Sequence, residues 1–476
     1  MFQVEKLPYF LNPFIMPNAG IFLSYFNVGV AIYILQAPLS YYLIDELDVS
    51  STNYNAYFTL VALPWSLKFI LGSISDGIPI FQYRRKSWLL IGWILYILSC
   101  LCLAMFGRPS FIATAIFSFL MTCSYILADV CNDALCVERA RHEQEEIKGA
   151  IQTAGYTIRA YGCIVGATLG TMLYNTATWG WGLTIAQLLA LSGLIPLTNM
   201  IPSFWSLEEI ATKNHITPSF KEIYWNIFET LQLKAVWYPM IFIYTYYIFQ
   251  IPNGAWTNFL VEGLEFSDFE LGLLTVSGAL LYWVGMMVFK LFLFDSGWRN
   301  IYLFTSLVNF VFSIGQVVLI LRYNKVLGIP DIVFALGDSA IMYFLWAINS
   351  MPTSIMFVML CPEGSEGVTY ALLTTIANLA WSVSFDIGTA FTSIWDVSNA
   401  ALQKGDFTGV LYLTLLTSFL QLLPLSLLFI LPNSRAEQRI LRDSGEKSWL
   451  GGVVLLAVVV ASIVITIIYN AALIMF

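Results

Sequence analysis

The sequence has few charged residues and almost no histidine, and it contains no stretch polar enough to form a soluble domain. Asp, Glu, Lys and Arg make up 11% of the 476 residues, and the two histidines lie in polar segments. A soluble domain carries roughly 25% charged residues. The chain has no G-x-x-x-x-G-K-[ST] loop, zinc motif or nucleophile elbow, and its seven cysteines lack metal-ligand spacing. We therefore expect no enzyme, no nucleotide-driven pump, no cofactor, no metal site and no nucleic-acid partner.

Long apolar runs separated by short polar loops fill the chain from residue 20 to residue 475. A helix needs about 20 apolar residues to cross a bilayer, and a helix satisfies its own backbone there. The runs predict an all-α integral membrane protein. Its helices are expected at 20–44, 55–78, 87–107, 110–136, 150–174, 179–203, 235–253, 268–293, 299–321, 330–360, 366–392, 408–431 and 448–475.

The longest gap between these runs separates six expected spans from six more and a further C-terminal span. Within the gap, apolar residues at helical spacing with charges between them predict an amphipathic helix over 219–233 on the membrane surface. Two six-helix bundles about a long loop are the layout of major facilitators, which bind substrate near the midplane and rock about it. The expected domains are an N-terminal bundle (1–203), a central cytoplasmic loop (204–234), a C-terminal bundle (235–432), and a cytoplasmic linker with an extra transmembrane helix (433–476).

The basic residues predict the orientation. Of 22 Lys and Arg, 16 fall in loops on one side of the expected helices, 4 on the other side, and 2 inside spans. The positive-inside rule places the richer side, and with it the N-terminus, in the cytoplasm. The sequence does not distinguish the plasma membrane from an organelle envelope.

The first motif lies between the second and third expected spans, in PWSLKFILGSISDGIPIFQYRRKSW, residues 64–88. Gly72 and Asp76 are one turn apart, and glycine lets a neighbouring helix approach closely. Asp76 can accept hydrogen bonds from a facing helix N-terminus or pair with Arg84 or Arg85. Such a clasp would close the cytoplasmic side and break when that side opens. The alternative is a simple positive-inside anchor.

The second motif is LADVCNDALCVERAR, residues 127–141. Asp129 and Asp133 are four residues apart and share one helix face. Two carboxylates at membrane depth are costly, which suits binding a proton or a cationic substrate edge; structural hydrogen bonding between helices is the alternative. Glu138, Arg139 and Arg141 follow at the cytoplasmic end, where they either join the gate or form a solvated helix end.

The third motif is CPEGSEGVTYALLTTIANLAWSVSFDIG, residues 361–388. Pro and Gly break the chain between the tenth and eleventh expected spans. Glu366 in this cytoplasmic turn is expected to cap the next helix or to act in the gate. Asn378 and Asp386 are eight residues apart, near two full turns, so they share a face of the eleventh span.

In order and spacing, these three segments resemble the folate-biopterin transporter family, a branch related to the major facilitators, over most of residues 20–430. Phe69 stands where the family often has Pro, and the span after residue 448 is an addition to twelve helices. The matching residues are Pro64, Trp65, Lys68, Gly72, Ser75, Asp76, Pro79, Arg84 and Arg85, then Asp129, Asp133, Ala134, Val137, Glu138, Arg139, Ala140 and Arg141, then Pro362, Gly364, Glu366, Thr369, Tyr370, Ala371, Leu372 and Asn378. The resemblance implies transport of folates, pterins or, in some members, S-adenosylmethionine.

A folate offers a flat pterin, whose donor-rich edge a carboxylate can bind, and an anionic glutamate tail that suits Lys or Arg. Lys68 and Arg159 are the only basic residues well inside the expected spans. They are candidates to hold the tail, or else to neutralise Asp129 or Asp133 in a structural ion pair. The expected substrate-binding residues are Lys68, Asp129, Asp133, Arg159, Asn378, Asp386, Trp65 and Trp381; the expected gating residues are Gly72, Asp76, Arg84, Arg85, Glu138, Arg139, Arg141 and Glu366.

We therefore predict a secondary transporter of folate- or pterin-type molecules that works by alternating access and is coupled to a proton carried by a carboxylate. A carrier of S-adenosylmethionine is the alternative within transport, since acidic and aromatic walls would suit its sulfonium. A membrane receptor or scaffold that does not transport is the alternative from another class. Its sign would be loss of intramembrane charge, which this sequence retains.

Overall fold

Every regular element in the described part of the chain is a helix. The computed structural model describes residues 16–47, 51–144, 147–175, 179–207, 209, 220–266, 268–361 and 366–475. Ten helical segments within them are long and apolar enough to cross a membrane, which confirms the all-α membrane class. The chain divides into unit 1 (Met1–Leu231, Ser354–Thr375 and Leu473–Phe476) and unit 2 (Gln232–Thr353 and Ile376–Ala472).

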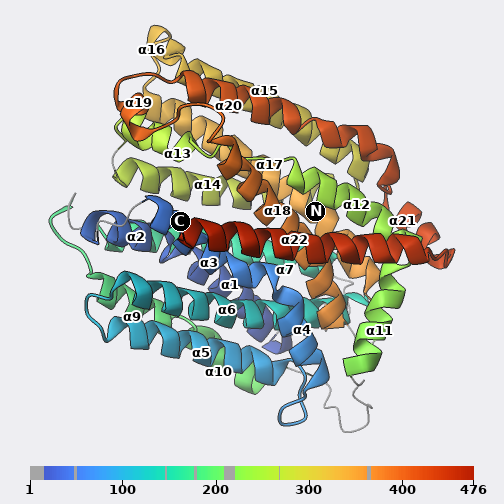
Figure 1. Ribbon diagram of the computed structural model, residues 1–476. Coiled ribbons are helices and arrows are strands. Elements are labelled where there is room, and N and C mark those ends of the chain that lie inside the picture. The colour runs from blue at the N-terminus through green and yellow to red at the C-terminus, as the bar shows by residue number, and fades with distance from the viewer. Residues whose placement is uncertain are drawn as a thin grey trace. The chain divides into compact units, whose positions relative to one another are not determined.

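Unit 1 is built on two sets of packed helices. Helix α1 packs against α7, α6 and α10, while α5 packs against α6 and α9 (Figure 1). The elements are α1 (Met16–Tyr33), α2 (Gln36–Tyr41), η3 (Tyr42–Glu46), α3 (Ser51–Ser66), α4 (Lys68–Gly77), α5 (Lys86–Ala104), α6 (Phe111–Ala140), α7 (Ala150–Leu173), α9 (Ile185–Leu194), α10 (Leu197–Ser206) and α11 (Phe220–Leu231). The chain returns to unit 1 for the end of α17 (Asp331–Leu360) and the start of α18 (Glu366–Phe391).

Glycines at four-residue spacing bring α7 against α1. A Cβ added to Gly162 would lie 2.1 Å from the backbone oxygen of Phe26, and one added to Gly166 would lie 2.6 Å from that of Val30. No side chain fits at such distances, so the two backbones approach as closely as small residues allow. This contact fixes the position of α7, which carries Arg159.

An interruption between α3 and α4 places Lys68 at the start of a helix. The expected span 55–78 is two helices, because Leu67 leaves the helical conformation with φ −110° and ψ 13°. Pro64, which donates no backbone hydrogen bond, lies one turn earlier inside α3. The two short helices replace one continuous span, and the change of direction lies next to Lys68.

The expected helix 179–203 was wrong at its start. The helix begins at Ile185, where Thr184 accepts a hydrogen bond from the Gln187 backbone and Gln187 returns one to Thr184. This capping box sets the first turn, and Gly180 before it has a φ of +70°. Pro196 then divides the span into α9 and α10.

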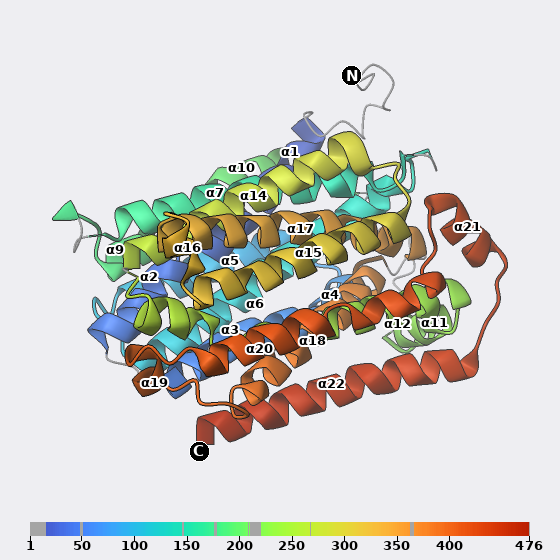
Figure 2. The same ribbon diagram turned by 90° about the horizontal axis from the view of Figure 1, so that it is seen from above.

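Unit 2 contains the remaining helices. Helix α15 packs against α20, and α12 packs against η8 and α21 (Figure 2). The elements are α12 (Lys234–Ile248), α13 (Trp256–Asn258), η6 (Phe259–Gly263), α14 (Asp268–Val288), η7 (Phe289–Leu293), α15 (Trp298–Ile320), α16 (Tyr323–Val326), most of α17 and α18, α19 (Asn399–Gln403), α20 (Thr408–Leu420), η8 (Leu423–Ile430), α21 (Arg435–Asp443) and α22 (Trp449–Met475).

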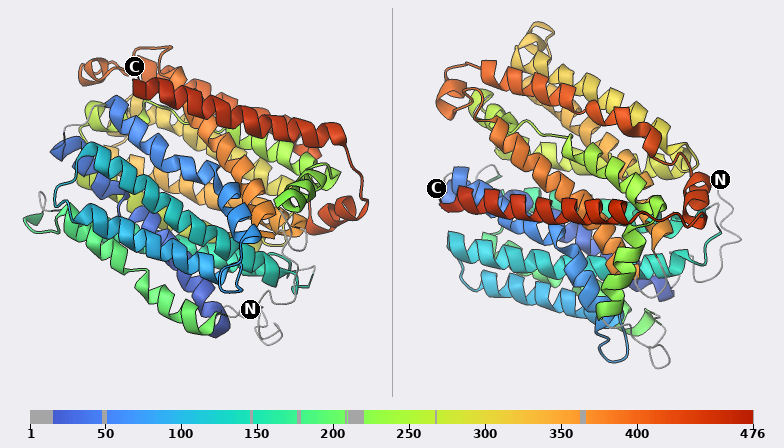
Figure 3. Two further views of the ribbon diagram at one scale, coloured as in Figure 1. Left: turned by 60° about the horizontal axis from the view of Figure 1, so that its bottom comes forward. Right: turned by 45° about the vertical axis from the view of Figure 1, so that its right-hand side comes forward.

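The C-terminal segment holds the long helix expected after residue 448. Figure 3 shows the short α21 followed by a turn and by α22 in red. Tyr244 on α12 shares a hydrogen bond with Ser462 on α22, and Lys234 pairs with Glu446 at 2.8 Å. The other face of α22 exposes apolar side chains such as Ile465 and Ile468, as a helix in contact with lipid does.

Candidate functional site

Four charged side chains from three helices of unit 1 form one buried cluster. Lys68 Nζ on α4 lies 2.6 Å from Asp129 Oδ2 and 2.6 Å from Asp133 Oδ2, both on α6. Arg159 on α7 pairs with Asp129 Oδ1 at 3.1 Å. The α6 helix presents both aspartates to one side because they are four residues apart. We call these four residues the charge cluster.

Hydroxyl and amide groups complete the coordination of Asp133. Its Oδ1 accepts hydrogen bonds from Tyr25 at 2.8 Å, from Gln152 at 2.9 Å and from Tyr156 at 3.2 Å. The Tyr156 hydroxyl is also 2.8 Å from the Tyr370 hydroxyl. Asp133 therefore accepts from four side chains in all, including Lys68, which is what a buried carboxylate requires.

Aromatic rings line the cationic side of the charge cluster. The Arg159 guanidinium carbon lies 4.2 Å from the ring centre of Tyr156, and Lys68 Nζ lies 5.7 Å from that of Trp65. Trp65 also contacts Tyr125, with ring centres 6.0 Å apart. Flat faces next to cations and carboxylates are the groups that would bind a conjugated, anionic ligand.

The charge cluster is electrically balanced and closed. Two cations meet two carboxylates, and the side chain of Lys68 is 3% exposed and that of Arg159 17% exposed. Breaking one partner of such a group leaves an uncompensated buried charge. A ligand reaches these groups if the side chains that cover them move, and its own charges can then replace an ion pair.

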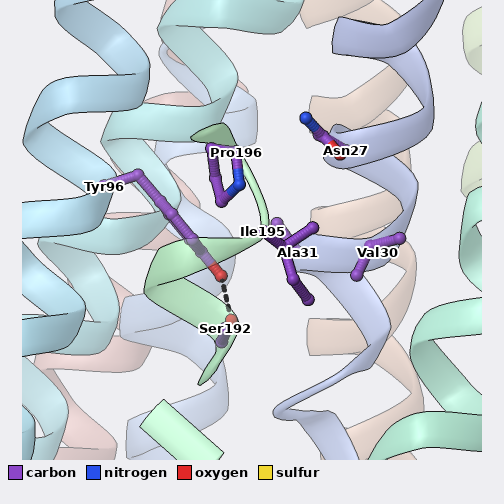
Figure 4. Close-up of a pocket in the computed structure, with 7 residues that line it drawn as sticks. All are labelled: Asn27, Val30, Ala31, Tyr96, Ser192, Ile195 and Pro196. Atoms are coloured by element: carbon purple, nitrogen blue, oxygen red, sulfur yellow. Dashed lines mark hydrogen bonds between the residues drawn. The ribbon is translucent and has the colours of Figure 1, made fainter. Parts of the chain in front are cut away.

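A separate small pocket in unit 1 lies between α1, α5 and the end of α9 (Figure 4). It has no room even for a water molecule, whereas ligand pockets begin at roughly 300 Å³. The Tyr96 and Ser192 hydroxyls share a hydrogen bond of 2.7 Å across it. Its lining residues are Asn27, Val30, Ala31, Tyr96, Ser192, Ile195 and Pro196. None belongs to the charge cluster, so this pocket is a packing defect and not a substrate site.

A second ionic group lies at the end of α4. Asp76 is fully buried and pairs with Arg85 and, at 3.5 Å, with Arg84. Its Oδ2 accepts a hydrogen bond of 2.6 Å from the backbone N–H of Val368 in the first turn of α18. A helix N-terminus favours a negative charge, so Asp76 joins α4, the α4–α5 turn and α18 within unit 1.

The remaining residues expected in the gate divide between this ionic group and other contacts. Arg85 Nε lies 3.3 Å from Glu138 Oε1, whereas Arg139 donates to Asn18 on α1 at 2.8 Å. Arg141 is the C-cap residue that follows α6, and Gly72 is buried in α4. The side chain of Glu366 lies outside the described residues.

Three expected substrate residues belong to unit 2. Asn378, Trp381 and Asp386 lie on the part of α18 that follows Thr375. The Trp381 ring contacts Tyr247 and Trp346, each with ring centres 6.1 Å apart. Trp381 therefore belongs to an aromatic wall of unit 2, and none of the three residues lies in the unit that holds the charge cluster.

Glu143 anchors the start of α7. Its carboxylate accepts hydrogen bonds from the backbone N–H groups of Gly149 at 2.6 Å and Ile151 at 2.7 Å. Burial raises the pKa of Glu143 to about 7, against the opposing effect of these N–H groups and of Lys148. Because α7 carries Tyr156 and Arg159, this acid in the α6–α7 turn helps to position the charge cluster.

Sequence reasoning missed several polar residues of the site. Gln152, Tyr156 and Arg159 follow the i, i+4, i+7 pattern of one helix face, so this spacing could have identified Gln152. Glu209 accepts hydrogen bonds of 2.8 Å and 2.7 Å from the backbone N–H groups of Arg84 and Lys86 and so holds the start of α5. No local pattern distinguishes Glu209 from other acids of its loop.

The interior of unit 2 is joined by neutral groups. Asn349 donates to the Tyr246 hydroxyl at 2.8 Å and accepts from Thr305. Asn309 donates to Gln421 at 2.6 Å. In the described residues, groups of three or more His, Cys, Asp and Glu side chains that could hold a metal ion are absent.

Comparison with known proteins places this architecture among transporters. A folate-biopterin transporter of Synechocystis is 28% identical over 408 residues, which cover 86% of this chain and 80% of the relative. Folate transporter 1 of Plasmodium falciparum is 24% identical over 83% of this chain and 75% of its own length. A bacterial homologue of the iron transporter ferroportin, solved in an outward-facing state, shares the fold with a TM-score of 0.52 at 14% identity, over 86% of this chain and 98% of that one. The model of the BT1 family matches residues 28–449, and the chain therefore belongs to the BT1 family of membrane transporters.

Proposed function

We propose that this protein is a secondary transporter of folate- or pterin-type molecules, that it works by alternating access and that transport is coupled to protons. The observation that carries the proposal is the buried charge cluster, with Tyr156 and Trp65 beside its cations. Ionisable groups at membrane depth are expensive and mark substrate or ion pathways. The curated relatives named above as folate or folate-biopterin transporters supply the substrate class.

In this proposal the cations and the carboxylates have different tasks. Lys68 and Arg159 bind the anionic tail, and Asp129 and Asp133 bind the donor edge of the pterin. The ligand's carboxylates replace the aspartates as partners of the two cations when unit 1 opens. The ligand's carboxylates then compensate the two cations, while the pterin edge supplies hydrogen-bond donors to the two aspartates. Substrate binding by Asn378, Trp381 and Asp386 of unit 2 stays a prediction.

The balance of charge favours an anionic or zwitterionic substrate over S-adenosylmethionine. A cationic sulfonium would need unpaired acidic walls, whereas Asp129 and Asp133 already have Lys68 and Arg159 as partners. Retention of these buried ions is also the reason for proposing transport over a receptor or scaffold role.

Uptake into proteoliposomes tests the proposal. Purified full-length protein is reconstituted, and entry of labelled folate, pterin and S-adenosylmethionine is measured with and without a proton gradient. We expect uptake of folate or pterin, enhanced by the gradient and lost in Lys68→Ala. Uptake of S-adenosylmethionine alone would overturn the substrate class, and normal folate transport by Lys68→Ala would remove the role of Lys68.

The Asp76 group is proposed as the cytoplasmic gate, on the cytoplasmic side that the positive-inside rule assigns. Asp76→Asn removes the charge that Arg84, Arg85 and the start of α18 share. We predict that folate binding to detergent-solubilised protein is kept while translocation falls roughly tenfold, as for loss of a modest coupling energy. Asp331→Asn is the matched control, because Asp331 forms its ion pair with Arg322 at a helix end of unit 2. Equal transport by both variants would contradict the gate.

A further inference from the structure

Unit 2 contains a buried carboxylate without a counter-charge. Asp338 on α17 is 7% exposed, and its Oδ2 accepts a hydrogen bond of 2.9 Å from the Gln316 side chain on α15. Its Oδ1 is buried and has no hydrogen-bond partner. Among the described residues no ion pair includes Asp338. This residue was not a candidate in the sequence analysis, although it lies within an apolar run.

The charged groups nearest along its own and the partner helix lie at their ends. Asp331 starts α17, seven residues and about 10 Å away, and is paired with Arg322 and Lys325. Arg299 lies at the other end of α15, about 25 Å from Gln316 along the axis, and is paired with Glu437.

The other elements that pack around this end of α17 bring apolar side chains toward it. Ala335, one turn from Asp338, belongs to a buried cluster with Leu319 of α15, Phe259 of η6 and Leu413 of α20. The acids and bases with described side chains on these elements, on the neighbouring α14 and in the adjoining turns lie at helix ends or in turns. They are Glu262, Glu265, Glu270, Lys404 and Asp406, besides Arg299, Arg322, Lys325 and Asp331. The tyrosines are Tyr282 on α14, Tyr343 on α17 and Tyr412 on α20.

Burial of an ionised carboxylate among apolar side chains costs free energy, so the neutral acid is the favoured form there. The contrast with unit 1 is direct. Asp129 and Asp133 are bonded to Lys68 and Arg159, so a proton arriving there would have to displace an ion pair. Asp338 has only one neutral amide to satisfy it, and its Oδ1 is free to take a proton.

We propose that Asp338 is the proton-binding carboxylate of the transport cycle, and this inference rests on the proposed function. The carboxylate takes one proton from water on one side of the membrane and becomes a neutral acid, which the apolar interior accommodates. When the site opens to the other side, the acid releases the proton to water and the carboxylate returns. No covalent bond other than O–H forms or breaks. Gln316 is a positioning residue, since its N–H stabilises the ionised form.

Two transport assays, folate exchange and folate accumulation, distinguish proton binding by Asp338 from substrate binding. Exchange of labelled for unlabelled folate across proteoliposomes requires no net proton movement, whereas accumulation driven by an acid-outside gradient does. We expect Asp338→Asn to exchange folate within twofold of wild type and to lose at least nine-tenths of gradient-driven accumulation. Asp396→Asn is the matched control in unit 2, because Asp396 is exposed before α19, and it should behave as wild type in both assays.

Other outcomes decide against the proposal. Accumulation by Asp338→Asn at the wild-type level overturns it, and so does loss of exchange together with accumulation in a folded Asp338→Asn, which would assign Asp338 to the substrate. If Asp338→Asn does not fold, Gln316→Leu decides. Loss of its hydrogen bond favours the neutral acid, so half-maximal accumulation must move to higher pH, and an unchanged profile overturns the proposal.

A substrate-free measurement separates this inference from the proposed function. If wild-type protein neither accumulates nor exchanges folate or pterin, the proposed function fails. Asp338 is then tested by infrared difference spectra of the purified protein between acid and alkaline conditions. A band of a protonated carboxyl group must be present in wild type and absent in Asp338→Asn. Identical spectra of the two proteins overturn the assignment.

Discussion

In unit 1 the four side chains of the charge cluster lie in the interior together with the Asp76 group, and each of the four has an opposite charge within 3.1 Å. In unit 2 neutral amides and hydroxyls join the helices, as Asn349 does with Tyr246 and Thr305, and Asp338 lies buried without a cation. Both units are helical, but different changes in charge would perturb their interiors. Unit 1 is held by charge balance, which any charged ligand disturbs. Unit 2, in our proposal, gains or loses one proton at Asp338.

The difference predicts where substitutions are most harmful. A neutral hydrogen bond contributes about 1 kcal/mol net, whereas removal of one partner of a buried ion pair costs about 3–5 kcal/mol. Substitutions in the charge cluster of unit 1 should therefore reduce stability and transport more than substitutions in the polar groups of unit 2. The following predictions test that order, from the largest effect to the smallest.

Lys68→Met should be the most damaging single change. It leaves Asp129 and Asp133 on one helix face with only Arg159 to compensate them, so we expect a loss of about 3–5 kcal/mol in the free energy of unfolding and complete loss of folate uptake. Thermal unfolding of the purified protein in detergent measures the first effect. Lys68→Met combined with Asp133→Asn restores charge balance and should recover most of the stability but not transport. A single variant as stable as wild type would contradict the charge-balance account.

Glu143→Gln should remove a pH dependence of stability. The pKa of this acid is raised by burial from 4.5 to about 7, so the folded protein keeps a proton that the unfolded chain has lost. The resulting stability is fully present below pH 4.5 and is lost as the pH rises through 7, by roughly 3 kcal/mol in total. Unfolding temperatures measured from pH 5 to pH 8 should fall in wild type and fall less in Glu143→Gln. Parallel profiles for the two proteins would show that the pKa of Glu143 in the folded protein is not raised to about 7.

Much of unit 1 could be predicted from single residues, because the sequence reports a charge in an apolar run directly. Lys68, Asp129, Asp133 and Arg159 were candidates for that reason, and the structure brings them together. Which charge pairs with which could not be predicted, since this depends on the crossing of α4, α6 and α7. The functional roles assigned to these residues remain predictions.

The missed features share another cause. Glu143 and Glu209 are acids in polar segments, where nothing in the sequence signals burial, and each binds backbone N–H groups that become available only at a helix start. The break at Leu67 was missed because Pro64 lies in an otherwise continuous apolar run. Asp338 shows the converse case: it lies inside an apolar run, but no basic residue beside it in the sequence marks it as part of a charged motif.

Glycines of the two units offer a milder comparison. Gly162→Ala places a methyl group 2.1 Å from the Phe26 backbone oxygen, whereas a Cβ at Gly315 on α15 meets nothing within 4 Å. We expect Gly162→Ala to cost about 2 kcal/mol through separation of α1 from α7 and to reduce uptake, since Arg159 moves with α7. Gly315→Ala should be neutral or slightly stabilising, because alanine is the better helix former. Equal unfolding temperatures for the two variants would show that the α1–α7 contact adapts freely.

Asn349→Leu in unit 2 should have the smallest effect of the four substitution sets. The change removes the hydrogen bonds to Tyr246 and from Thr305, but Thr305 keeps its bond of 2.7 Å to the Ile301 carbonyl. We expect a loss of about 1 kcal/mol in stability and folate uptake within twofold of wild type, measured in the same proteoliposomes as Lys68→Met. If Asn349→Leu abolished uptake while remaining folded, the polar groups of unit 2 would bind substrate directly, and the division between a charged site in unit 1 and a supporting unit 2 would have to be abandoned.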